Sequence, residues 1–121
     1  MKAEIKSHII TDDFFISPEL YVPENKNVFS LGFSFDIGPK GTDAAETFHV
    51  NISNKCYKKQ VVFVDENIVF RKGCIELEYY DYSKIMKAIN IYIHNIDCNT
   101  WKEVETELTK VFFGEYENYN K

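Results

Sequence analysis

The chain has 121 residues, of which 45% are hydrophobic and 16% aromatic, and its formal net charge is −5. This length predicts a single domain over residues 1–121, and the composition excludes an intrinsically disordered chain. No apolar run approaches the roughly 18 residues of a membrane span, and the first residues lack the apolar region of a secretory signal. We therefore expect a cytoplasmic protein.

The first half of the chain predicts three strands. Residues 3–9 alternate weakly, whereas residues 28–37 and 46–53 alternate strictly between apolar and polar side chains, which indicates strands with one buried face. The segment between the first two strands contains two prolines. We interpret it as an ordered loop whose aromatic side chains, Phe14, Phe15 and Tyr21, enter the core.

The two strict runs are connected by Gly38-Pro39-Lys40-Gly41. A phosphate-binding loop would need four residues between its first glycine and a Gly-Lys-Ser/Thr sequence, and it would open a helix. Here strands flank the segment, and the proline removes an amide donor. Proline second and glycine fourth instead favour a type I turn, so we predict an antiparallel hairpin.

The second half changes from strand to helix periodicity. Residues 60–64 form a short strand or an apolar segment under a loop, and residues 74–81 alternate, with Tyr79 on the apolar side and Tyr80 on the polar side. Helical spacing follows over residues 82–96 and 99–113, the second helix beginning with a Thr100–Glu103 capping box. We predict an α+β fold in which a single antiparallel β-sheet carries two C-terminal helices on one face.

The sequence contains no local signature of catalysis or cofactor binding. Its three cysteines lack zinc-ribbon or thioredoxin spacing, so we expect Cys56, Cys74 and Cys98 to be reduced thiols. His94 and Cys98 are four residues apart and could share a helix face, but a zinc site needs three or four ligands. We therefore expect no metal, no cofactor and no enzymatic activity.

The negative charge is concentrated in the C-terminal part, because residues 74–120 contain nine acids and four bases, whereas residues 1–73 contain ten and nine. This distribution argues against nucleic-acid binding and favours a basic protein partner. Carboxylates beside exposed tyrosines suit such a surface. The candidate partner-binding residues are Glu76, Glu78, Asp81, Glu103, Glu107, Glu115, Tyr116, Glu117 and Tyr119.

Several segments, in the same order, resemble one family. They are "MKAEIKS", "FDIGPKGTDAAETFHV", "LEYYDYSKI", "NTWKEVETEL" and "EYENY". The chain resembles the eighth numbered family of bacterial immunity proteins, from polymorphic-toxin and contact-dependent growth inhibition systems. It departs from that family in "SNKCYKK", which lacks the usual proline and tryptophan, and in Phe113-Gly114, where a tryptophan usually precedes the acidic tail.

The resemblance implies a non-catalytic protein that binds the C-terminal domain of a cognate toxin in the cytoplasm. Many such toxins are nucleases with basic clefts, so the resemblance also implies that an acidic surface occludes the cleft. Two alternatives are a small-molecule-binding or hydrolytic domain, with a pocket between sheet and helices near His94 and Cys98, and a structural subunit of a larger complex.

Overall fold

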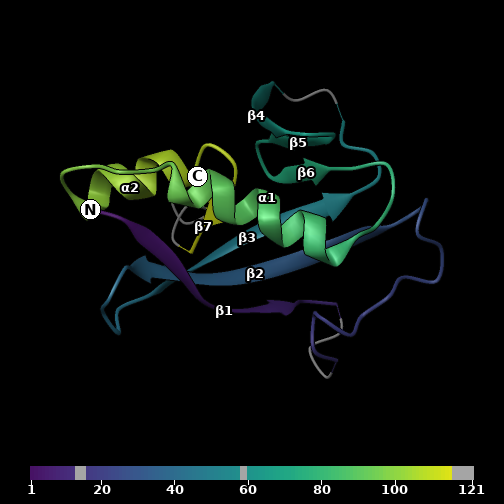
Figure 1. Cartoon of the computed structure of the whole chain (residues 1–121), viewed down its shortest axis with the longest axis horizontal. Helices are drawn as coiled ribbons and strands as arrows, with labels where there is room; N and C mark the ends of the chain where they lie inside the picture. The colour runs from purple at the N-terminus through teal and green to yellow at the C-terminus, as the bar shows by residue number, and fades with distance from the viewer. Residues whose placement is uncertain (13–15, 58–59, 116–121) are drawn as a thin grey trace.

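A sheet and two helices make up the fold (Figure 1). The computed structural model describes residues 1–12, 16–57 and 60–115. Within these ranges the strands are β1 (Ala3–Ile10), β2 (Ser30–Pro39), β3 (Glu46–Ser53), β4 (Val61–Asp65), β5 (Ile68–Arg71), β6 (Cys74–Glu76) and β7 (Phe113–Gly114), and the helices are α1 (Tyr82–His94) and α2 (Trp101–Leu108). The sheet order is β1-β2-β3-β6-β5-β4, with β7 also pairing with β3. All pairings are antiparallel except β3 with β6, which confirms the predicted α+β class.

The β2–β3 hairpin is antiparallel and alternates as predicted, but its turn lies one residue further along the chain. The Thr42 amide donates to the Pro39 carbonyl at 3.2 Å, and Gly41, third in this turn, has a φ of 82°. A positive φ at the third position is a feature of a type II turn, so the predicted type I turn over residues 38–41 is wrong. Gly38 lies in β2, and glycine suits this position because a Cβ there would meet the Ala44 carbonyl oxygen at 1.7 Å.

Both helices begin where the sequence predicts and end earlier. The Asp81 side chain caps α1 by accepting from the Lys84 amide, and the Thr100–Glu103 capping box opens α2. The first helix ends at His94 and the second at Leu108, two and five residues before their predicted ends. None of the described helices has the length and apolar character needed to cross a membrane.

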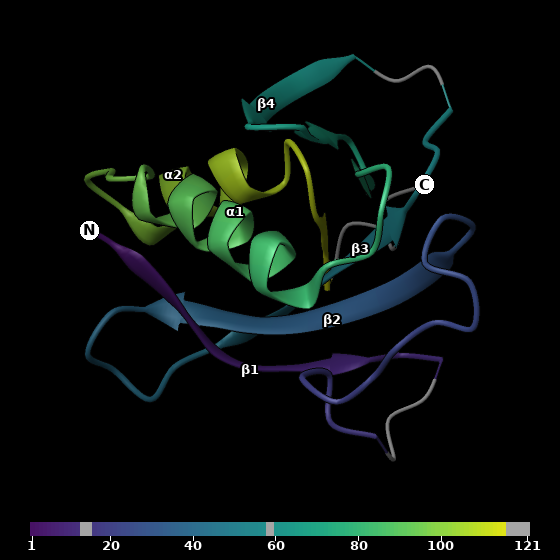
Figure 2. The ribbon, with the colours of Figure 1, turned by 45° about the vertical axis from the view of Figure 1, so that its right-hand side comes forward.

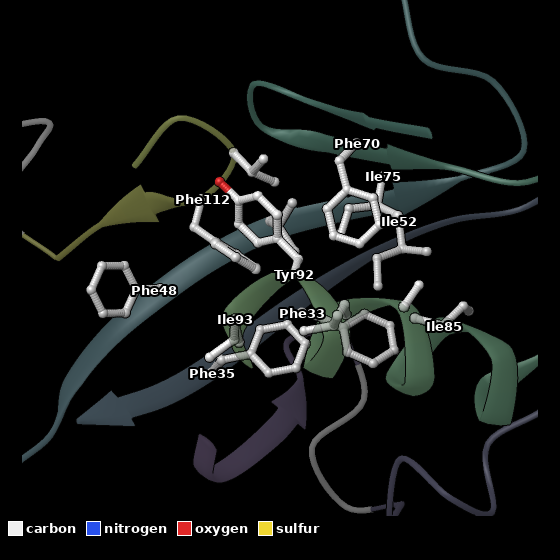
Figure 3. Close-up of a cluster of buried hydrophobic side chains, with 14 of the residues drawn as sticks. Phe33, Phe35, Phe48, Ile52, Phe70, Ile75, Ile85, Tyr92, Ile93 and Phe112 are labelled. Atoms are coloured by element: carbon white, nitrogen blue, oxygen red, sulfur yellow. The ribbon is translucent and has the colours of Figure 1, made fainter. Parts of the chain in front are cut away.

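The core lies between the sheet and α1, which the sheet curves around (Figure 2). Tyr92 of α1 contacts the rings of Phe63 and Phe70 from β4 and β5, each about 5.3–5.4 Å between centroids. At the other edge, Tyr82 of α1 lies against His8 of β1 at 6.0 Å. Figure 3 shows the interior, where Phe33, Phe35, Phe48, Ile52, Phe70, Ile75, Ile85, Tyr92, Ile93 and Phe112 come together.

The segment before α1 departs from the predicted alternation. Residues 61–65 do form a strand, which resolves the uncertain 60–64 pattern, but β6 has only three residues. After it the chain leaves the sheet, and the Tyr80 amide donates to the Lys26 carbonyl at 2.8 Å. Tyr80 is consequently buried and Tyr79 is 50% exposed, the reverse of the predicted sides. Tyr80 packs edge-on against Tyr21, as the loop prediction required; Phe14 and Phe15 lie outside the described residues.

Two of the three cysteines form a disulfide, Cys56–Cys74, with the Cα atoms 6.0 Å apart. The expectation of reduced thiols is therefore wrong for this pair and confirmed for Cys98, which is free. The cause is tertiary, because Cys74 pairs with Asn51 in the parallel β3–β6 ladder while Cys56 follows the end of β3. Sequence spacing alone gave no sign of this contact.

Candidate functional site

The acidic side chains of the C-terminal part form two groups at different ends of α1. We call Glu76, Glu78 and Asp81 the β6–α1 acids; they precede the first turn of α1. We call Glu103, Glu105 and Glu107 of α2, which follows α1 in the chain, together with Glu46 at the start of β3, the α2 acids. The two groups lie toward opposite ends of α1, whose thirteen residues span about 20 Å, so the predicted candidates do not form one patch (Figure 1).

Two of the β6–α1 acids have internal structural roles. Glu76 Oε1 accepts from the Cys56 amide at 3.2 Å and lies 3.4 Å from Arg71 Nε. Asp81 caps α1 through the Lys84 amide at 3.2 Å. Glu78 is exposed. Two of the three carboxylates in this group are therefore engaged in contacts within the protein.

Local sequence explains how α2 presents its acids. Thr100 and Glu103 satisfy each other's backbone amides at 3.2 and 3.1 Å, which fixes the first turn. Val104 and Leu108 are fully buried and hold the helix on the core. The remaining positions face outward or flank the buried stripe, so the glutamates are carried by a short, firmly anchored helix.

One pair of α2 acids has an unusual electrostatic environment. The Trp101 indole N–H donates to Glu46 Oε1 at 2.5 Å, and Glu105 lies one turn after Trp101 and hydrogen-bonds with Glu46. Burial, the hydrogen bond and repulsion from Glu46 raise the pKa of Glu105 to about 7. The positive charge of Lys102 lowers this pKa, but its effect is the smallest of the four. Carboxyl groups forced together are common at functional sites.

Sequence reasoning missed this pair. Glu46 starts β3 and Glu105 lies in α2, so only the packing of α2 over the end of the β2–β3 hairpin brings them together. The i, i+4 spacing of Trp101 and Glu105 placed both on one helix face, but nothing in the sequence identified what that face meets.

The balance of charge also differs between the two groups. The β6–α1 acids have Arg71 beside Glu76 and Lys84 one turn from Asp81, and Lys26 lies over the neighbouring Tyr79 ring at 5.5 Å. Three carboxylates there stand beside three bases. The four α2 acids stand beside three lysines: Lys102, Lys110, which pairs with Glu107, and Lys72, which donates to the Thr109 carbonyl at 2.6 Å. Above pH 7, where Glu105 is ionised, one more carboxylate than bases remains at α2.

The C-terminal candidates can be placed only in part. Glu115 is exposed directly after β7, which pairs with Phe48 and His49 of β3. Tyr116, Glu117 and Tyr119 lie outside the described residues.

The alternative pocket is divided. His94 is exposed at the last residue of α1 and lines a hollow of about 490 Å³, whereas the half-buried Cys98 lines a different hollow of about 320 Å³. The helix ends between them, so the predicted shared helix face does not form. In the described ranges, no group of three or more His, Cys, Asp and Glu side chains is arranged to hold a metal ion.

One of three comparisons with known proteins gives a match. The family model described as Immunity protein 8 matches residues 3–119. No curated protein and no solved structure matches the chain.

Proposed function

The chain belongs to the immunity protein 8 family, and we propose that it binds a cognate bacterial toxin domain in the cytoplasm and neutralises it without catalysis. The observation that carries this proposal is the family match, which covers all but four of the residues. Disulfides are rare in the cytoplasm, so we expect Cys56 and Cys74 to be reduced there, while residues 51–53 and 74–76 stay paired in the parallel β3–β6 ladder.

The α2 acids are the surface best suited to the toxin. They retain an excess of negative charge on an anchored helix, where Glu103 and Glu107 are four residues apart and Glu105 hydrogen-bonds with Glu46. Such a local field accelerates the approach of a basic protein and favours its binding cleft over neutral surfaces. We propose that the toxin is a nuclease and that α2 blocks the cleft that would otherwise hold nucleic-acid phosphates.

Co-expression tests this function directly. The chain is produced together with the C-terminal domain of a large secreted toxin whose gene adjoins its own, once that neighbour has been identified, and growth and co-purification are scored. We expect the chain to restore growth and to co-purify with the toxin domain. A catalytically inactive toxin that still co-purifies serves as the control for binding without toxicity. Failure of both rescue and co-purification contradicts the proposal for that toxin.

A further inference from the structure

The two edges of the sheet are differently protected. β1 forms one edge and β4 the other. An edge strand presents unpaired backbone N–H and C=O groups, which proteins protect with charges, bulges or covering segments. On β1, Lys6 pairs with Glu4, the register shifts between Ile5 and Ser7, and α1 packs alongside.

β4 has much less of this protection. Its valines Val61, Val62 and Val64 are 46%, 37% and 51% exposed, and it pairs with β5 alone among the described strands. A register shift lies between Val61 and Phe63, but Val64 and Asp65 continue the ladder beyond it. In Figure 2 the strand forms the outer margin of the sheet, away from β1. Its exposed backbone and β-branched side chains are the chemistry that another extended strand recognises.

The strand is also held in place before any partner arrives. The Phe63 ring packs against Phe70 at 5.3 Å and Tyr92 at 5.3 Å, which fixes the middle of β4 to the core. A two-residue connection joins β4 to β5, with Glu66 at a φ of 54°. A partner strand would therefore meet an edge that needs little ordering, and this lowers the entropic cost of association.

Charge identifies the partner strand. Asp65 and Glu66 lie at one end of β4, and the Glu66 carboxylate remains exposed in its 3.7 Å contact with Lys87. At the other end, Lys72 and Lys110 line a hollow of about 420 Å³ with Val61 and Val62. Lys110 also pairs with Glu107, and the Lys72 amine donates to the Thr109 and Phe112 carbonyls, so these lysines contribute positive charge near the edge while keeping their internal contacts. We propose that β4 pairs with β4 of a second copy of this chain in antiparallel fashion, which places the acidic end of each strand beside the basic end of the other.

The size of this contact determines its strength. The surface area that a five-residue strand can bury is well below the roughly 800 Å² per partner of stable interfaces. The dimer is therefore weak and forms at high protein concentration. Its salt dependence follows from the charge pairing, because exposed charges are screened by added salt.

Sedimentation velocity with two matched variants tests the proposal. Val64→Lys puts a charge on the edge, and Val28→Lys makes the same change at a valine that is 68% exposed in the loop before β2. We expect the wild type and Val28→Lys to dimerise as concentration rises, and Val64→Lys to weaken dimerisation at least tenfold. Amide exchange in β4 of the wild type should slow with concentration.

A second variant keeps the test informative if Val64→Lys fails to fold. Glu66→Lys changes an exposed turn residue, and we expect it to weaken the dimer several-fold with only a small change in melting temperature, because the 3.7 Å contact with Lys87 that it removes is exposed. A protein that stays monomeric at all concentrations, or a dimer insensitive to both Val64→Lys and Glu66→Lys, overturns the proposal. Protection of β4 amides only after toxin is added also overturns it, because the edge would then receive a toxin strand.

Discussion

The β6–α1 acids and the α2 acids have the same side-chain chemistry but differ in their contacts within the protein. Glu76 and Asp81 are used by the fold, one beside Arg71 and the other at the start of α1. Glu46 and Glu105 are instead pressed together, and the pKa of Glu105 rises to about 7. The comparison teaches that a carboxylate's availability to a partner depends on its internal contacts more than on its place in an acidic stretch of sequence.

Removing Glu76 should have the largest effect on stability. In Glu76→Ala, the half-buried Arg71 side chain loses its carboxylate and the Cys56 amide loses its acceptor. We expect the free energy of unfolding to fall by about 2 kcal/mol, the usual cost of leaving such groups unsatisfied. Urea denaturation measures it. Glu78→Ala is the control and should change stability by less than about 0.5 kcal/mol; equal losses in the two variants would contradict the assignment.

Removing the N-cap of α1 should lower the free energy of unfolding by a smaller amount. Asp81→Ala deletes the acceptor for the Lys84 amide, and we expect a loss of about 1 kcal/mol. Asp81→Asn keeps a capping oxygen and should retain most of the stability. Denaturation of both variants separates the cap from the charge. If both lose equal stability, the charge of Asp81 and not its hydrogen bond supports the helix.

The pH dependence should be the smallest effect. The pKa of Glu105 is raised on folding from 4.5 to about 7, so the folded state holds its proton more tightly. The resulting stabilisation is complete below about pH 4.5 and is lost as the pH rises through 7. Burial lowers the pKa of His8, which acts in the opposite direction, so the informative quantity is the difference between wild type and Glu105→Gln.

Melting temperatures at pH 5 and pH 8 measure this difference. We expect the wild type to lose more stability than Glu105→Gln over this interval, because only the wild type must ionise a carboxyl group beside Glu46. Parallel pH profiles for the two proteins would show that Glu105 titrates as an ordinary surface glutamate.

Local patterns predicted those parts of the fold that depend on neighbouring residues. The alternation of β2 and β3 and the Thr100–Glu103 capping box are such features, and each is present. The features that were missed depend on tertiary pairing. The parallel β3–β6 ladder brings Cys56 to Cys74, and the packing of α2 brings Glu105 to Glu46. The acidic candidates were found by composition, but composition could not distinguish those already used by the fold.

The central claim is that the α2 acids, and not net charge alone, guide the toxin to this protein. Two triple variants remove the same number of charges: Glu103→Gln/Glu105→Gln/Glu107→Gln at α2, and Glu76→Gln/Glu78→Gln/Asp81→Asn at β6–α1. Glutamine at position 103 preserves the capping box. The measurement is the rate of association with the cognate toxin domain at pH 8 and low ionic strength.

We expect the α2 variant to associate about tenfold more slowly than the wild type and to lose most of its salt dependence. The β6–α1 variant should associate at close to the wild-type rate. Equal slowing of the two variants would show that net charge alone steers the toxin, and a slower β6–α1 variant would place the toxin at the other end of α1; either result contradicts the account.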